Sequence, residues 1–439
     1  MAKRIVVLGA GISGVGAAVL AKKKGFDVFV SDKGTITDEN KAVLLNNEIE
    51  WEEQKHSSAS ILKADEVIKS PGIPDGVDLI QQLIAKEIPV ISEIEFAFRY
   101  TKAKIAAITG SNGKTTTSLL LGHVLKSAGY DVLIAGNVGV GFSLAIAERD
   151  YDYIVLEMSS FQLDGIKNFR SDVAILLNIT PDHLDRYDYK LENYAASKFR
   201  ITKNQTEQDV LIYNADDALM KVLNRKAKKL PISLTTEQIE GGFYNNNKIT
   251  INLNNNTMTM QELALQGKHN IFNSMAAAMA ARVFEVKDTV IRQAMIDFQN
   301  VEHRMEYVIT VHGIDFVNDS KATNVNACWY ALESMTKDVV WIVGGVDKGN
   351  DYAELGEMVS EKVKAIICLG ENNENIINAF TGKVDTIVQA SSMQEAVAQS
   401  YALSGKQDVV LLSPACASFD LFTNYEDRGL QFKKEVRNL

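Results

Sequence analysis

The sequence predicts an α/β protein of three domains: a Rossmann-like N-terminal domain, a central P-loop mononucleotide-binding domain with a parallel or mixed sheet, and a Rossmann-like C-terminal domain. Short runs of β-branched residues alternate with helical stretches, a pattern typical of parallel sheets covered by helices. A chain of 439 residues corresponds to about three domains at roughly 150 residues each. We expect these domains to span residues 1–95, 96–300 and 301–439.

The composition excludes several classes of protein. A formal net charge of -10 argues against general binding to nucleic acid or to anionic membranes, both of which need basic surfaces. We find no apolar run of about 20 residues, the length that spans a bilayer. Cys328, Cys368 and Cys416 show no metal-ligand spacing, which favours a reducing compartment. We therefore expect a cytoplasmic protein. We also expect a monomer, although no residue pattern in the sequence indicates the oligomeric state.

The first predicted domain opens with a strand at Arg4–Leu8 and a glycine turn, Gly9–Gly14. This turn fits G-x-G-x-x-G, and Asp32 ends the next strand, 18 positions after Gly14. The combination is the fingerprint of dinucleotide binding, in which glycines let the backbone approach phosphate. From these residues alone, two alternatives remain: a nucleotide site, including one for NAD or FAD, and a tight turn that only packs a helix. Further strands are expected at Val28–Val30 and at Val67–Lys69, the latter followed by Ser70, Pro71 and Gly72.

The second predicted domain begins with a strand at Ile105–Ile108 that runs into a phosphate loop, Thr109–Thr116. Glycines turn backbone N–H groups onto phosphate oxygens, and the following helix adds its positive N-terminal end. Lys114 is expected to reach the β- and γ-phosphates and Thr115 to hold Mg²⁺. The strict pattern G-x-x-x-x-G-K-[ST] is not met, because Ile108 occupies its first glycine position. Further strands are expected at 132–134, 153–156 and 173–177, and a hairpin over Asn245–Asn256.

Two side chains at strand ends are candidates for binding the metal. Glu157 ends one apolar strand, and His183 lies just beyond another. Ligands of open α/β sheets bind outside the carboxyl ends of the strands, and Mg²⁺ prefers oxygen ligands and keeps several waters. Together the two residues predict a metal site beside the phosphate loop.

The third predicted domain carries polar clusters after its strands. Strands are expected at 339–343, 365–369 and 409–412, and Glu302–Arg304 opens the domain. Three loops, Asn318–Asn324, Gly344–Gly349 and Ser413–Ser418, each follow a predicted strand. Because strand ends of one parallel sheet share an edge, we expect these loops to converge on one crevice.

In order and spacing these segments resemble the Mur ligases of peptidoglycan synthesis, over essentially the whole chain. The resemblance is strongest to the branch that adds D-glutamate to UDP-N-acetylmuramoyl-L-alanine, with ATP and two Mg²⁺ ions. The matching segments are Thr109–Thr116, Gly136–Gly139, Glu157–Leu163, Asn178–Arg186, His269–Asn270, Glu302–Arg304, Asn318–Asn324 and Ser413–Asp420.

The resemblance implies a role for each matching position. It implies UDP-substrate contacts at Ile12, Ser13, Asp32, Ser70, Gly72, Asn137 and His183. It implies ATP contacts at Gly110, Ser111, Asn112, Gly113, Lys114, Thr115, Thr116, Asn270, Asn273, Arg304 and Asp319. It implies D-glutamate contacts at Thr323, Lys348, Ser418 and the backbone of Tyr425, and metal ligands at Thr115, Glu157, His183 and Lys198. It also implies that Lys198 is carbamylated, although residue type alone predicts a solvated helix lysine there; Lys114, Lys198, His183 and Glu157 would be the catalytic set.

Two positions depart from the family pattern. Lys33-Gly34 follows Asp32 where Thr-Arg is expected, and Tyr425 stands where Phe is expected. A sister ligase is the nearest alternative, but the Asp-Asn-Pro-Arg signature of the diamino-acid branch is absent. Folylpolyglutamate synthetases lack a first domain of this kind. A nicotinamide oxidoreductase and a non-catalytic nucleotide-binding regulator are alternatives from other classes.

Overall fold

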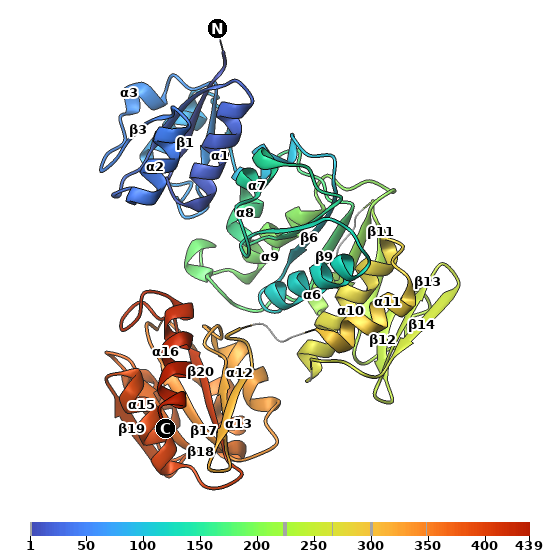
Figure 1. The fold of residues 1–439 in the computed structure, drawn as a ribbon, viewed down its shortest axis with the longest axis vertical. Coiled ribbons are helices and arrows are strands. Elements are labelled where there is room, and N and C mark those ends of the chain that lie inside the picture. Colours follow the sequence, from blue (N-terminus) through green and yellow to red (C-terminus); the bar gives the residue numbers. More distant parts are fainter. Residues whose placement is uncertain (1, 223–225, 266, 299–301, 348) are drawn as a thin grey trace. The chain divides into compact units, whose positions relative to one another are not determined.

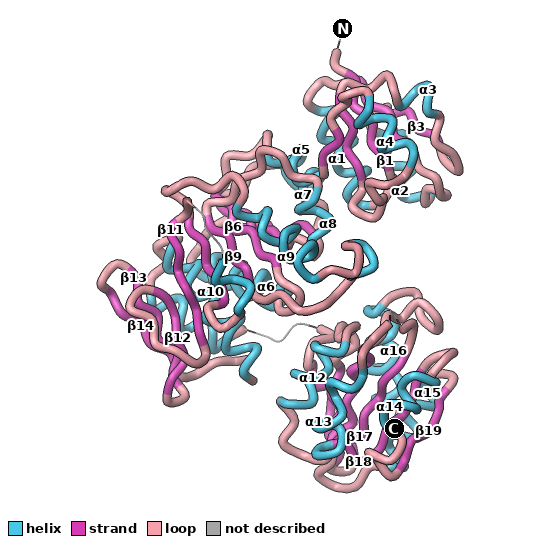
Figure 2. Tube along the Cα trace, turned by 180° about the vertical axis from the view of Figure 1, so that it is seen from behind, coloured by secondary structure: helices cyan, strands magenta, loops and turns pink. Residues whose placement is uncertain are grey.

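The computed structural model describes residues 2–222, 226–265, 267–298, 302–347 and 349–439. It contains three sheets, each flanked by helices (Figure 1). The chain divides into two compact units, one of residues 1–263 and 272–296 and the other of residues 264–271 and 297–439. The alternation of helix and strand along the chain is visible in Figure 2. In the described part of the chain, no helix has both the length and the apolar character needed to cross a membrane.

The first sheet is entirely parallel, with the strand order β3-β2-β1-β4-β5. The strands are β1 (Arg4–Leu8), β2 (Asp27–Ser31), β3 (Glu50–Glu52), β4 (Glu66–Lys69) and β5 (Val90–Ile91). The helices are α1 (Ile12–Lys23), α2 (Asp38–Asn46), α3 (Ser58–Ile61), α4 (Asp78–Ala85) and α5 (Glu93–Phe98). The chain leaves β1 in one direction and returns to its other side at β4, so the glycine turn after β1 lies at a topological switch point.

Gly14 fills a position in this turn where a side chain does not fit. A Cβ atom on Gly14 would lie 1.9 Å from the carbonyl oxygen of Gly9. Because that atom belongs to the backbone, it cannot rotate away. We expect Gly14→Ala to lower the free energy of unfolding by about 3 kcal/mol, at the upper end of overpacking effects.

Chemical denaturation measures this change. Gly11→Ala is the matched control, since a Cβ there meets nothing within 4 Å. Equal stability of the two variants would contradict the close-approach argument.

The second sheet has the order β14-β13-β12-β11-β10-β9-β6-β8-β7. Its strands are β6 (Lys104–Thr109), β7 (Val132–Gly136), β8 (Tyr153–Glu157), β9 (Val173–Leu176), β10 (Val210–Asn214), β11 (Lys228–Ser233), β12 (Gly241–Asn245), β13 (Lys248–Leu253) and β14 (Asn256–Met260). The helices that follow these strands are α6 (Lys114–Ser127), α7 (Phe142–Glu148), α8 (Ser160–Asp164), α9 (Leu191–Phe199), α10 (Lys268–Val283) and α11 (Asp288–Asp297). β6 pairs in parallel with β8 and β9, so the loop that follows it emerges from the middle of the sheet.

The asparagine-rich stretch forms more than the single hairpin that its sequence predicts. It supplies two turns of a three-stranded antiparallel meander, one at Asn246-Asn247 and one at Asn254-Asn255. All four residues have positive φ, at 51°, 56°, 52° and 60°. Two-residue hairpin turns of type I′ need positive φ at both central residues, and asparagine tolerates that conformation. The predicted sheet is therefore mixed, and its antiparallel strands lie at one end.

The third sheet has the order β15-β16-β20-β17-β18-β19. Its strands are β15 (Glu306–Val311), β16 (Ile314–Asn318), β17 (Val339–Gly344), β18 (Val363–Leu369), β19 (Thr386–Ala390) and β20 (Val409–Ala415). Its helices are α12 (Val325–Glu333), α13 (Gly356–Lys362), α14 (Glu374–Phe380), α15 (Met393–Leu403) and α16 (Tyr425–Arg437). Alternate residues of β17 enter two different core clusters, one containing Trp341 and the other Ile342. Both faces of this sheet are therefore covered, which explains why the strands read as continuous apolar runs.

Candidate active site

The phosphate loop joins β6 to α6, as predicted. At one position of the loop, the backbone conformation and a close neighbour leave room only for glycine. Gly113 has φ of 83° and is the residue immediately before α6. A Cβ there would lie 2.3 Å from Oδ1 of Asn273. The structure thus places Asn273, predicted to contact ATP, directly against the loop.

The polar stretch after β9 braces the loop. The backbone N–H of Ser111 donates to the carbonyl of Asn178 at 2.9 Å. The Asn178 side chain accepts from the N–H of Asn112 at 2.8 Å and donates to the Asn112 carbonyl at 3.0 Å. The Ser111 hydroxyl donates to the carbonyl of Thr180 at 2.8 Å. These bonds fix the loop from the neighbouring strand, a role that the sequence alone does not reveal for Asn178.

Two lysines meet at one carbonyl of the loop. Nζ of Lys114 donates to the carbonyl of Gly110 at 2.8 Å and to that of Ser111 at 2.7 Å. Nζ of Lys198, on α9, donates to the same Gly110 carbonyl at 2.8 Å. Lys198 is only 1% exposed, so it is not the solvated lysine that residue type predicts.

The environment of Lys198 favours a neutral amine. Burial, and then the positive charge of Lys114, hold the pKa of Lys198 well below its usual value. Nζ of Lys198 lies 4.5 Å from the centroid of the Tyr194 ring, and the Tyr194 hydroxyl lies 3.2 Å from Oγ of Ser111. Tyr194 precedes Lys198 by four residues on a helix and so shares its face; that spacing is the only sequence signal for its place in the site. A neutral lysine amine is nucleophilic, which is the state that carbamylation requires.

Glu157 presents a buried oxygen without a protein partner. Oε1 accepts from Nδ2 of Asn137 at 2.9 Å. Oε2 is buried and has no hydrogen-bond partner among the residues that the structure describes. A buried carboxylate oxygen left in this way is strongly unfavourable unless a cation or another donor reaches it. The geometry therefore fits a metal ligand at Glu157, with Asn137 fixing its orientation.

His183 lies on the loop after β9, in a left-handed conformation with φ of 51°. Its imidazole packs edge to face against Phe161, with ring centroids 5.3 Å apart, and its side chain is 38% exposed. Within the described ranges, no three His, Cys, Asp or Glu side chains are grouped to hold a metal by themselves. A magnesium ion here would need substrate phosphates and waters as further ligands, which is its usual mode of binding.

In the first sheet, Asp32 holds the glycine turn. Its Oδ2 accepts from the N–H of Ala10 at 2.5 Å, and its Oδ1 accepts from the N–H of Gly34 at 2.7 Å. Ile12 is 70% exposed, and Ser13 is half-buried beside it at the start of α1. The N–H of Ser70 donates to the carbonyl of Leu8 at 2.9 Å, so β4 ends next to the turn. These residues, with Gly72, lie at one edge of the sheet.

In the third sheet, the predicted strand-end loops do converge. β16, β20 and β17 are adjacent and parallel, so the loops that follow them meet. The Ser413 hydroxyl donates to Asp319 at 3.0 Å, and the N–H of Ala415 donates to the carbonyl of Ala322 at 2.9 Å. Burial raises the pKa of Asp319 to about 7.

The remaining predicted residues of this unit are placed individually. Ser418 and Asn270 are buried, whereas Thr323, Arg304 and Tyr425 are half-buried. Lys348 lies outside the described residues.

Arg428, on α16, is a buried residue that the sequence analysis missed. It is 1% exposed. Its guanidinium donates to Oγ of Ser320 at 3.0 Å, to the Ser320 carbonyl at 2.8 Å and to the Cys416 carbonyl at 3.2 Å. The Ser320 hydroxyl in turn donates to the carbonyl of Tyr425 at 2.8 Å. Arg428 therefore joins α16 to two of the three converging loops.

Replacing Arg428 by methionine is expected to lower the free energy of unfolding by about 3 kcal/mol, because two carbonyls and a hydroxyl lose their donors in a buried place. Chemical denaturation would measure the loss. Arg437→Met, at the exposed end of the same helix, is the control. A loss no larger than that of the control would show that the buried bonds contribute nothing.

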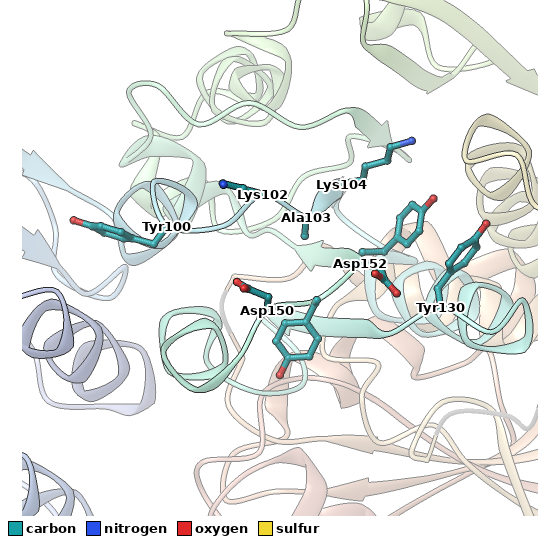
Figure 3. Close-up of a pocket in the computed structure, with 9 residues that line it drawn as sticks. Tyr100, Lys102, Ala103, Lys104, Tyr130, Asp150 and Asp152 are labelled. Carbon is teal, nitrogen blue, oxygen red and sulfur yellow. The ribbon is translucent and has the colours of Figure 1, made fainter.

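A separate groove of about 710 Å³ lies at the other end of the second sheet, where β6 and β8 begin (Figure 3). It is lined by Tyr100, Lys102, Ala103, Lys104, Tyr130, Asp150, Tyr151, Asp152 and Tyr153. In Figure 3 the hydroxyls of Tyr100 and Tyr130 point to opposite ends, and the ammonium groups of Lys102 and Lys104 point apart. Its polar groups do not converge, so the groove is not the site of the predicted chemistry.

Comparison of this sequence with known protein families supports the resemblance to Mur ligases in each of the three parts of the chain. Three family models match: the MurD N-terminal domain at residues 4–77, the Mur ligase middle domain at residues 108–281, and the Mur ligase glutamate ligase domain at residues 303–416.

Among curated relatives, the chain is 55% identical to UDP-N-acetylmuramoylalanine–D-glutamate ligase of Christiangramia forsetii and 52% identical to that of Bacteroides fragilis, covering 100% of each chain. Among solved structures, it matches UDP-N-acetylmuramate-alanine ligase from Thermotoga maritima with a TM-score of 0.64 and 17% identity, covering 100% of both chains. It matches a ligase of the same organism solved in complex with ADP with a TM-score of 0.62 and 17% identity, covering 96% and 99%. These two likenesses bear on the fold alone, whereas the full-length identity to the curated relatives establishes kinship: the chain belongs to the Mur ligase family.

Proposed function

We propose that this chain joins D-glutamate to UDP-N-acetylmuramoyl-L-alanine, using ATP and releasing ADP and phosphate. One feature of the geometry carries the proposal: Lys114 and the buried amine of Lys198 meet at Gly110, within a phosphate loop braced by Asn178. Such a site suits phosphoryl transfer, in which positioning and charge stabilisation supply most of the catalysis. The names of the full-length relatives give the substrates.

In the proposed reaction, a carboxylate oxygen of the L-alanyl group attacks the γ-phosphorus of ATP, and ADP leaves. The deprotonated amine of D-glutamate then attacks the carbonyl carbon of the acyl phosphate. The tetrahedral intermediate collapses to an amide as phosphate leaves. Lys114 holds the transferring phosphoryl group and compensates its charge.

Magnesium, when bound, would neutralise charge on the phosphate oxygens. Two ions are proposed: Thr115 would hold the first, and Glu157 and His183 would hold the second, with a carbamylated Lys198 as a further ligand. The free Oε2 of Glu157 supports that assignment. The lowered pKa of Lys198 supports carbamylation, because a neutral amine is the nucleophile that this reaction needs. The charge of the metal also favours it, since a cation repels an ammonium but attracts a carbamate, which behaves as a carboxylate.

The remaining roles follow the same division of the chain. We assign the UDP part of the substrate to residues 1–95 through Ile12, Ser13, Asp32, Ser70 and Gly72, joined by Asn137 and His183. Residues 96–300 bind ATP, with Asn270 and Asn273 near the nucleoside, and Arg304 and Asp319 assist from the third domain. Residues 301–439 bind D-glutamate through Thr323, Lys348, Ser418 and the backbone of Tyr425. We propose a cytoplasmic monomer that needs neither nucleic acid nor a membrane.

The decisive experiment measures ADP release with ATP, UDP-N-acetylmuramoyl-L-alanine and a panel of D- and L-amino acids. We expect turnover only with D-glutamate. Turnover with L-alanine or a diamino acid instead would assign the chain to a sister branch. A change in nicotinamide absorbance without ADP release would instead identify the glycine turn as a redox-cofactor site.

A further inference from the structure

We propose that Asn350 and Tyr352 are positioning residues that set the affinity for the amino-acid substrate. They clamp the loop after β17 to the loop after β20. This inference rests on the proposed function, because it takes Ser418 and its neighbours as the amino-acid site. Neither residue was singled out by sequence reasoning.

The clamp consists of one amide and one phenol between the two loops. Nδ2 of Asn350 donates to the carbonyl of Ala415 at 3.1 Å and to the hydroxyl of Tyr352 at 3.2 Å. The Tyr352 hydroxyl lies 3.1 Å from Sγ of Cys416. Tyr352 is 4% exposed, so these bonds are shielded from water. The segment after β17 is thereby bonded to Ala415, the last residue of β20, and to Cys416, which follows it.

The clamped segment carries a backbone conformation that needs support. Ala415 has φ of 58°, a left-handed conformation that is unfavourable for alanine. The amide of Asn350 holds the carbonyl of this same residue. Beyond it, Val346 and Ala417 exchange two backbone hydrogen bonds, at 2.9 and 3.2 Å. Ser418 follows directly, so its position depends on a turn that the clamp maintains.

The other end of the clamp is anchored by Asp347. Its Oδ1 accepts from the N–H groups of Gly349 and Asn350 at 2.8 and 2.9 Å. Its Oδ2 accepts from Nδ2 of Asn375 at 2.9 Å. The carboxylate thus orders the backbone of Gly349 and Asn350 and presents Asn350 to Ala415.

The Tyr352 hydroxyl and the Cys416 thiol keep their protons across the physiological pH range. Burial raises the pKa of the Tyr352 hydroxyl, and it raises the pKa of the Cys416 thiol to about 11. Both groups therefore remain neutral, and the clamp acts as a fixed support. Loosening it would require the substrate to order the two loops on binding, which weakens affinity without altering the activation of the carboxylate by ATP.

Steady-state kinetics of Tyr352→Phe and Asn350→Ala test the inference. We expect the KM for D-glutamate to rise about tenfold for Asn350→Ala and about fourfold for Tyr352→Phe, the scale of one lost hydrogen bond. We expect kcat and the KM values for ATP and for the UDP substrate to stay within about twofold. The double variant should show less than the product of the two effects, because both residues act in one network.

Tyr401→Phe is the matched control. Tyr401 lies on α15, and its hydroxyl lies 2.7 Å from Nδ1 of His312. Removal of this hydroxyl should change no kinetic constant. An unchanged KM for D-glutamate in Tyr352→Phe, which keeps the volume of the ring, would overturn the inference. A lower kcat together with higher KM values for all three substrates and a lower melting temperature would also overturn it. That result would show that the two residues have a purely structural role.

The test separates failure of the clamp from failure of the proposed function. If the wild-type enzyme turns over with a different amino acid, the proposed function fails while the KM for that amino acid still tests the clamp. If the wild-type enzyme prefers D-glutamate and the clamp variants leave its KM unchanged, only the present inference fails.

Discussion

Lys198→Ala is expected to lower kcat by about 10³-fold or more, the scale of removing a preorganised group that stabilises charge in phosphoryl transfer. The reason is local, since Lys198 is buried against the Gly110 carbonyl, and burial and the charge of Lys114 hold its pKa well below the usual value. A carbamate formed there would add a carboxylate-like anion beside the phosphate loop. Alanine provides neither the anion nor the amine.

The measurement is ADP release with saturating substrates, with and without acetate or formate. We expect the short carboxylic acid to restore part of the activity of Lys198→Ala, because it can occupy the space of the missing carbamate. Lys203→Ala, an exposed lysine shortly after the same helix, is the control and should be fully active. A fully active Lys198→Ala enzyme would refute the carbamate.

Lys114→Ala is expected to abolish D-glutamate-dependent ADP release, with a loss in kcat of about 10³-fold or more. Lys114 is the first residue of α6 and bonds to two carbonyls of the loop. In the proposed reaction its ammonium compensates the charge of the transferring phosphoryl group. Lys198 cannot replace it, because Lys198 is buried and its pKa is lowered.

The fold should survive this change, since Lys114 is only partly buried. Thermal denaturation alongside the assay separates loss of chemistry from loss of structure. Lys126→Ala, at the exposed end of the same helix, should retain both. Wild-type turnover by Lys114→Ala would remove the phosphate loop from the mechanism.

The fold was predictable from the sequence where local pattern and long-range pairing agree. β1, β6, β8 and β17 are short apolar runs followed by glycine or a polar turn, and they form strands as predicted. The strands β10 and β11 were not identified. β11 begins with two lysines and contains Pro231, so pairing with β10 and β12 defines it, whereas the apolar run of β10, Val210–Tyr213, was overlooked. The second asparagine turn was missed because two turns in one polar stretch look like one.

The residues of the candidate site that lie at strand ends were predictable from the sequence. The residues that hold the site loops in place through hydrogen bonds were not. Glu157 is the last residue of β8 and Asp319 directly follows β16, so their place at the sheet edge could be predicted from the sequence. Tyr194, Arg428 and Asn350 lie far in sequence from the groups that they hold, at separations of 83, 108 and 65 residues. Residue type does not reveal such contacts. The burial of Lys198 is of the same kind, since its helix has no pattern that marks the lysine as an inward-facing residue.

The brace of the phosphate loop has a consequence for how such a chain can diversify. The hydrogen bonds described for that loop begin and end between Gly110 and Lys198, within one compact unit. The three converging loops and Arg428 lie in the other unit. Substitutions in the converging loops therefore remove no hydrogen bond of this brace. Related chains can vary these loops, Asp319 apart, while the support of the phosphate loop stays the same.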